Sequence, residues 1–308
     1  MLAFYIILGV IGFLIIIFLI LLFSVYWAVF ESPKKWQLND LEIEKSLQYQ
    51  GYEKDIINLV KQMKSIPCED AYIKSYDRLK LHARIYPNEK SNKVAILFHG
   101  YRGTACRDFS GGAKELINMG LNVVLIDQRA HGLSKGHSIT FGRKEQKDVI
   151  SWIKYSKERF GLDKEVILVG ISMGAATVLF AANKINNVKI IADCPYSSEK
   201  SILQLAIKRM RLPTNFFFHI VNLASILFSH ANLNIDNAIK TVGESYNKIL
   251  IIHGDNDHVV PINESKIIYE SNKDKVQYEV FHGAEHGMSY LADTERYVSI
   301  IEDFLSDK

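Results

Sequence analysis

Residues 165–176 read EVILVGISMGAA, an apolar run that leads through a G-x-S-x-G motif into small residues. The pattern predicts a buried strand, a sharp turn centred on Ser172 and a helix that begins at Met173. Such a turn lifts the serine hydroxyl clear of the sheet, and Gly170 and Gly174 let the neighbouring backbone approach it. A helix N-terminus at this point favours developing negative charge. The stretch therefore predicts a serine nucleophile at the end of a strand.

Short apolar runs alternate with longer segments of helical periodicity on both sides of this motif. Strands are expected at 93–98, 122–126, 165–169, 189–192, 248–252 and 276–281, after a hairpin formed by 71–75 and 79–86. Helices are expected at 104–119, 143–160, 173–184, 261–271 and 284–305. Because strands that are apolar throughout need burial on both faces, the alternation predicts an α/β fold with a mostly parallel sheet between two layers of helices.

One long interval interrupts this alternation. Residues 196–247 separate two predicted strands and are strongly apolar and helix-like around 216–227. An insertion of this length and apolarity favours a small helical lid over a site at the carboxyl ends of the strands.

A serine hydroxyl is a weak nucleophile, so it needs a base and a group that orients the base. Two later strands are each followed by such groups, in HGDNDHVVP at 253–261 and HGAEHG at 282–287. The acid is Asp255 or Asp257 and the base is His282 or His286, and the residues alone leave both pairs open. The chain order of Ser, Asp and His fits three groups that emerge at one edge of a sheet.

Two further loops complete a family pattern. Residues 99–104 read HGYRGT after one predicted strand, and residues 127–134 read DQRAHGLS after the next. Together with the serine, acid and histidine loops, they make the chain resemble the α/β-hydrolase superfamily, specifically serine hydrolases related to monoglyceride lipases, lysophospholipases and serine aminopeptidases. The resemblance covers about residues 70–303. Its one mild departure is Ala130, where the family has glycine.

The resemblance implies an eight-stranded, mostly parallel sheet and assigns the site residues. It makes Ser172 the nucleophile, Asp257 the acid and His286 the base. The backbone N–H groups of Tyr101 and Met173 would form the oxyanion hole. Asp255 and His282 would then cap loops, and the DQRAHGLS turn would shape the loop beside the site.

The N-terminus is a candidate membrane segment. No Asp, Glu, Lys or Arg precedes Glu31, and the apolar run from Leu2 to Phe23 is long enough to cross a bilayer. A cleaved signal peptide is the rival interpretation, but the positive n-region and the small-residue cleavage site that it needs are missing. The sequence predicts an anchor at 1–30, an amphipathic connector at 31–69 and a hydrolase domain at 70–308. The basic residues nearest the span are Lys34, Lys35 and Lys45, all of which follow it, and none precedes it. This distribution favours a cytoplasmic domain.

Composition excludes several other classes of protein. The chain has 308 residues, of which 48% are hydrophobic, and its net charge is +3 with 37 basic and 34 acidic residues. That balance gives no electrostatic footprint for nucleic-acid binding. Its three cysteines, Cys68, Cys106 and Cys194, lack the spacing of a zinc site, and neither a metalloprotease nor a phosphate-loop motif occurs. We therefore expect neither a metal nor a cofactor.

These observations favour a membrane-anchored serine hydrolase that cleaves carboxylic esters, with lipophilic acyl esters as substrates. The expected partners are a small-molecule or lipid ester and the bilayer. Two alternatives stay open, a serine peptidase that acts on short peptides and a non-catalytic membrane adaptor that keeps the fold. Deletion of residues 1–30 is expected to leave a soluble, active domain.

Overall fold

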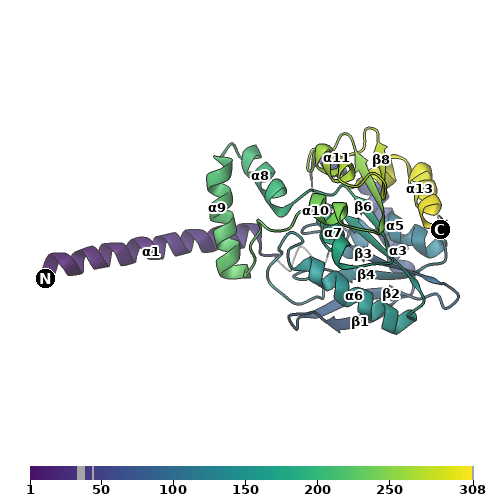
Figure 1. The fold of residues 1–308 in the computed structure, drawn as a ribbon, viewed down its shortest axis with the longest axis horizontal. Coiled ribbons are helices and arrows are strands. Elements are labelled where there is room, and N and C mark those ends of the chain that lie inside the picture. Colours follow the sequence, from purple (N-terminus) through teal and green to yellow (C-terminus); the bar gives the residue numbers. More distant parts are fainter. Residues whose placement is uncertain (33–38, 44, 307–308) are drawn as a thin grey trace.

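The computed structural model describes residues 1–32, 39–43 and 45–306, and an eight-stranded sheet forms its centre (Figure 1). The strands are hydrogen-bonded in the order β1-β2-β4-β3-β5-β6-β7-β8. The β1–β2 and β2–β4 pairs are antiparallel, and the other neighbours are parallel. The predicted fold class is therefore confirmed. The strands are β1 (Glu69–Lys74), β2 (Lys80–Tyr86), β3 (Lys93–Phe98), β4 (Asn122–Asp127), β5 (Glu165–Ile171), β6 (Val188–Asp193), β7 (Lys248–Gly254) and β8 (Val276–Phe281).

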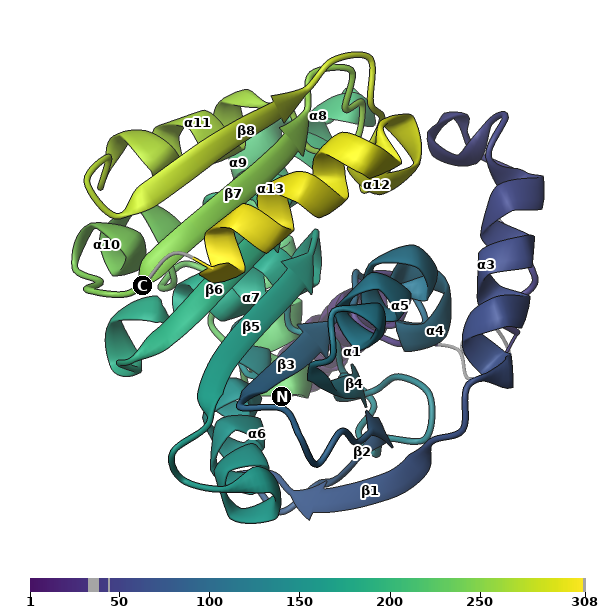
Figure 2. The same cartoon turned by 90° about the vertical axis from the view of Figure 1, so that its right-hand side faces the viewer.

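Helices cover both faces of the sheet (Figure 2). One layer consists of α6 (Glu145–Phe160), α7 (Met173–Phe180), α10 (Ala238–Gly243) and α11 (Asn263–Glu270). The other consists of α3 (Glu53–Ser65), α4 (Ala105–Asp108), α5 (Ser110–Asn118), α12 (Ser289–Ala292) and α13 (Thr294–Ser306). In β3, Val94 and Ile96 face the first layer, whereas Ala95 and Leu97 face the second. This alternation explains why the central strands are apolar throughout.

Two predicted helices are broken in the structure, and the α-helix of the connector lies in its second half. The helix expected at 104–119 divides into α4 and α5 because Phe109 leaves the helical conformation. The helix expected at 284–305 divides into α12 and α13 at Asp293. In the predicted connector, helix α3 begins only after Gly51, whose φ of +89° is typical of a turn. Residues 33–38 and 44 of the connector, with Lys34 and Lys35 among them, lie outside the described residues.

Helix α1 (Leu2–Val29) projects from the domain, which it contacts through its last turns (Figure 1). Leu22, Tyr26 and Phe30 follow one another at intervals of four residues, so they share one helix face, and all three are buried in the main core. Tyr26 also forms a 2.8 Å hydrogen bond with the hydroxyl of Ser138, and Ile139 N–H donates to the carbonyl of Phe30 at 2.8 Å. The last turns of α1 are therefore part of the hydrolase core.

The insertion between β6 and β7 packs against α1. It contains α8 (Glu199–Arg209), α9 (Thr214–Ala224) and a π-helical turn, η3 (Ser225–Ser229), and α9 crosses α1 (Figure 1). The ring of Phe228 lies 5.4 Å from the rings of both Phe23 and Tyr26. Phe218 and Val221 of α9 face the core. The segment expected to form a lid thus packs one side of α9 against the domain and the end of the N-terminal helix.

Candidate active site

Ser172 occupies a strained turn between β5 and α7. Its φ is +55°, a conformation that a residue other than glycine adopts rarely and that is often found at functional sites. Glycine is required on both sides of the turn: a Cβ at Gly174 would overlap the carbonyl of Phe98, and one at Gly170 would overlap the backbone of Gly174. The structure thus shows the physical reason for each glycine of the G-x-S-x-G motif.

A continuous line of hydrogen bonds joins Ser172, His286 and Asp257. The Ser172 hydroxyl lies 2.8 Å from Nε2 of His286, and Nδ1 of His286 lies 2.7 Å from Oδ2 of Asp257. Because a carboxylate can only accept, Nδ1 is the donor and Nε2 is free to accept from serine. The other carboxylate oxygen of Asp257 accepts from the backbone N–H groups of Val259 and Val260, both at 2.7 Å. Asp257 is therefore rigidly oriented toward the imidazole.

The surroundings of Asp257 keep its carboxylate ionised. Burial alone raises its pKa, but the charge of His286 and the hydrogen bonds from His253 and His286 outweigh burial and hold the pKa well below its usual range. His253 Nε2 lies 3.2 Å from Asp257 and donates to the carbonyl of Val260 at 2.9 Å. An ionised, buried carboxylate at this place can stabilise a positive charge on the neighbouring imidazole.

The two competing residues, Asp255 and His282, pair with each other at the surface. His282 Nδ1 lies 2.7 Å from the Asp255 carboxylate, which also accepts from the N–H of Gly283. The side chain of His282 is 86% exposed. Their hydrogen bonds join the loops after β7 and β8, so the geometry favours the capping role and leaves Asp257 and His286 beside the serine.

The loop at 99–104 passes beside the nucleophile. A Cβ at Gly100 would lie only 3.6 Å from the Cβ of Ser172, so the loop backbone is close to the serine. The N–H of Gly100 donates to Asp108 at 2.9 Å, whereas the N–H of Tyr101 has no hydrogen-bond partner among the described residues. Met173 is the first residue of α7, so its N–H has no partner within the helix. Neither predicted oxyanion donor is thus committed to a hydrogen bond within its own loop or helix.

His131 holds this loop from the buried side. It is fully buried, its Nδ1 donates to the carbonyl of Arg129 at 2.9 Å, and its Nε2 accepts from the N–H of Arg102 at 3.1 Å. Burial and the neighbouring His99 lower the pKa of His131 to about 3. A neutral His131 keeps the lone pair that holds the loop, which is the shaping role expected for the DQRAHGLS turn.

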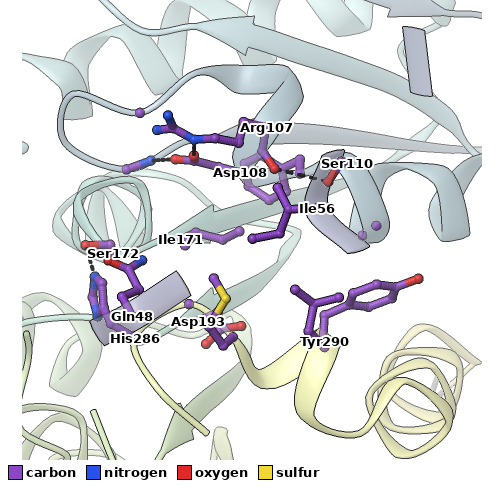
Figure 3. Close-up of a pocket in the computed structure, with 18 of the residues that line it drawn as sticks. Gln48, Ile56, Arg107, Asp108, Ser110, Ile171, Ser172, Asp193, His286 and Tyr290 are labelled. Carbon is purple, nitrogen blue, oxygen red and sulfur yellow. Dashed lines mark hydrogen bonds and ion pairs between the residues drawn. The ribbon is translucent and has the colours of Figure 1, made fainter. Parts of the chain in front are cut away.

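A pocket of about 940 Å³ opens from Ser172 and His286 (Figure 3). It lies on the face of the sheet covered by α3, α5, α12 and α13. Much of its wall is apolar, with Ile56, Leu116, Ile171, Leu291 and Ile301 among the lining residues. Tyr49, Gln48 and part of α3 supply one side, and no described residue of the insertion at 196–247 lines it. The connector, rather than the insertion, therefore supplies part of the pocket wall, and it carries no sequence motif that could have revealed this role.

Comparisons with known proteins agree with the fold. A family model described as serine aminopeptidase, S33, matches residues 89–218. The structure of the Pyrococcus furiosus esterase Pf2001 superposes with a TM-score of 0.66 at 23% identity and covers 89% of this chain and 98% of that chain. Our chain has the α/β-hydrolase fold. The structure of Est1E from Butyrivibrio proteoclasticus with ferulic acid bound has a TM-score of 0.59 at 20% identity over 77% of this chain and 100% of that chain.

Two further relatives of this α/β-hydrolase have no established function. The uncharacterized protein YqkD of Bacillus subtilis (strain 168) is 26% identical over 198 residues, which are 62% of this chain and 64% of YqkD. The uncharacterized membrane protein YNL320W of Saccharomyces cerevisiae is 25% identical over 256 residues, which are 80% of this chain and 82% of that protein. The latter match extends over most of both chains.

Proposed function

We propose that this α/β-hydrolase is a membrane-anchored serine hydrolase that cleaves carboxylic esters with lipophilic acyl groups. The observation that carries the proposal is the hydrogen-bonded line from Asp257 through His286 to Ser172 at the mouth of a largely apolar pocket. A nucleophile, a base and an orienting acid in this order are the components of acyl transfer through a covalent intermediate.

The reaction proceeds in two halves. Ser172 Oγ attacks the acyl carbonyl carbon as its proton passes to Nε2 of His286, and the N–H groups of Tyr101 and Met173 bind the oxyanion. The carbon–oxygen bond to the alcohol then breaks, and His286 returns the proton to the leaving alkoxide. Water, activated by His286, attacks the acyl-enzyme in the same way and releases the carboxylic acid. Asp257 stabilises the imidazolium in both halves.

The choice of substrate rests on the pocket and on structural relatives. Apolar side chains line much of the cavity beside Ser172, where an acyl chain would lose its contact with water. Two of the superposed structures are an esterase from Pyrococcus furiosus and Est1E with ferulic acid bound. Both the cavity and these relatives support an ester substrate over a peptide.

A comparison of two substrate classes tests this preference. We expect kcat/KM for long-chain p-nitrophenyl esters to exceed that for aminoacyl p-nitroanilides by at least about tenfold, because an apolar pocket rewards each buried methylene. Steady-state kinetics on the full-length protein in detergent measure both values, with a short-chain ester as the control for leaving-group reactivity. A preference for the anilides would indicate a peptidase, and hydrolysis of neither class would favour the adaptor.

We further propose that α1 is a retained membrane anchor. The domain first buries a side chain of α1 at Leu22, so residues 2–21 stay free, and roughly 20 residues span about 30 Å, the thickness of a hydrocarbon core. Cleavage of α1 as a signal would remove Leu22 and Tyr26 from the core, which supports retention. Lys34 and Lys35 follow the span and no basic residue precedes it, so the proposal places the hydrolase domain on the cytoplasmic side.

The insertion adds an exposed apolar surface beside the last turns of α1, where that helix enters the domain. Phe216, Ile220, Leu223 and Leu227 are spaced by four, three and four residues, so they share one face of α9 and η3. Phe216, Leu223 and Leu227 are exposed on this face, and no Asp, Glu, Lys or Arg occurs from 212 to 235. A helix of this kind, crossing a spanning helix, fits the boundary between headgroups and acyl chains.

Fluorescent probes on full-length protein test this placement. We label Leu223→Cys with the dye NBD in a Cys68→Ser background, because Cys106 and Cys194 are buried and Cys68 is exposed. In vesicles of phosphatidylcholine and phosphatidylglycerol, its emission is expected to shift to the blue and to be quenched by spin-labelled lipid. Leu162→Cys is the matched control, since Leu162 is an exposed leucine between α6 and β5. Equal, unquenched emission from both positions would contradict membrane contact by α9.

A further inference from the structure

The loop that carries the proposed oxyanion donor is tied to the end of α1. The hydroxyl of Tyr101 donates to the carbonyl of Val29 at 2.6 Å. Nη2 of Arg102 donates to the carbonyls of Ala28 and Glu31 at 2.7 and 2.9 Å. The last carbonyls of a helix have no partner within it and form the negative end of its dipole, so a guanidinium binds there favourably.

The two side chains are held in place by more than these bonds. The ring of Tyr101 stacks on Phe141 at 5.0 Å, and Phe141 in turn packs edge-on against Phe30 at 6.0 Å. Burial raises the pKa of Tyr101 to about 12, so its hydroxyl stays protonated and remains a donor. The end of α1 therefore meets the loop through one aromatic stack and three hydrogen bonds.

The loop itself depends on outside support. Arg102 has a φ of +52°, which costs free energy and persists only where surrounding contacts impose it. From the domain side, Asp108 and His131 accept from the N–H groups of Gly100 and Arg102. Those two bonds fix the residues before and after Tyr101. On the outer side, the side chains of Tyr101 and Arg102 bond to carbonyls at the end of α1.

We propose that the side chains of Tyr101 and Arg102 are positioning residues, which use the carbonyl end of α1 to hold the Tyr101 N–H in its oxyanion-binding place. The proposal rests on the serine hydrolase function above. It makes the membrane helix part of the catalytic scaffold as well as an anchor. Neither side chain needs to touch the substrate, because only the backbone N–H would bind the oxyanion.

Kinetics of full-length variants test the proposal. Loss of one oxyanion donor costs about 100- to 1,000-fold in kcat, so a misplaced donor in Arg102→Met is expected to lower kcat by roughly tenfold to 100-fold. The KM for a p-nitrophenyl ester should stay near the wild-type value, since the interaction is made in the transition state. Tyr101→Phe should have a smaller effect in the same direction. Arg102→Lys should restore part of kcat, because an ammonium also binds helix carbonyls.

A matched control and the wild type distinguish failure of the positioning role from failure of the proposed serine hydrolase function. Arg159→Met removes an arginine of α6 that pairs with Glu69 of β1, and it should leave kcat unchanged. If wild type is active and Arg102→Met matches it in kcat, the positioning role is refuted while the serine hydrolase function stands. If Arg102→Met raises KM alone, or Arg102→Lys gives no recovery, the role is also refuted. Wild type without Ser172-dependent activity would instead overturn the proposed function.

Discussion

Replacing Ser172 by alanine is expected to lower kcat for ester hydrolysis by about 10⁵- to 10⁶-fold, because the nucleophile and its base act as one unit. The hydroxyl of Ser172 bonds to His286, and the turn around it is fixed by Gly170, Gly174 and the backbone. The thermal midpoint should therefore change by no more than a few degrees. Initial rates and thermal unfolding, measured on the same preparation, check both halves of the prediction.

A matched pair of acid variants tests the rest of the triad. Asp257→Asn is expected to lower kcat by about 10⁴-fold, because an amide that donates toward Nδ1 favours the wrong tautomer of His286. Asp255→Asn should keep the wild-type kcat, since Asp255 pairs with the exposed His282. Loss of activity in Asp255→Asn with activity retained in Asp257→Asn would reverse the assignment of the acid.

Two N-terminal truncations are expected to differ sharply in stability. Deletion of residues 2–21 keeps Leu22, Tyr26 and Phe30, whereas deletion of residues 2–31 removes all three from the core. A fully buried side chain of this size contributes roughly 1.5–3 kcal/mol, and a domain is stable by only about 5–15 kcal/mol. The longer fragment, which begins at Leu22, should therefore fold, and the shorter fragment, which begins at Ser32, should be strongly destabilised or unfolded.

Denaturant unfolding of the two fragments measures this difference. The structure thus changes the expectation that deletion of residues 1–30 would leave an active domain, because the last turns of α1 pack inside the core and bind the 99–104 loop. Equal midpoints for the two fragments would show that these turns contribute little to folding.

Local patterns were sufficient to predict the parallel strands of the sheet and the turn that carries Ser172. The apolar run at 165–169 and the flanking glycines place Ser172 at a strand end, and β5 ends at Ile171, one residue before it. The period of each run separates strands from helices because burial on both faces requires continuous apolarity. By contrast, spacing alone left Asp255 and Asp257 equivalent. The resemblance to a family singled out Asp257, and the structure places it, rather than Asp255, beside His286.

Contacts between distant segments could not be read from the chain. The apolar residues of α9 are compatible with a lid over the site. In the structure this segment packs on α1 instead, a contact between parts of the chain about 200 residues apart. Gln48 and Ile56 carry no motif, yet both line the pocket because the connector folds back over the sheet edge. Likewise, no motif links Arg102 to the end of α1, although its side chain bonds to the carbonyl of Ala28 there. Each of these contacts joins residues that the sequence keeps apart.

Labelling with a fluorophosphonate probe tests the central claim most directly, because the probe reacts covalently with an activated serine. Purified full-length wild type should be labelled, and Ser172→Ala, folded to the same extent by circular dichroism, should not. That result would show that Ser172 is an activated nucleophile in an open site. Wild type that is folded but unlabelled, or labelling that persists in Ser172→Ala, would contradict the account.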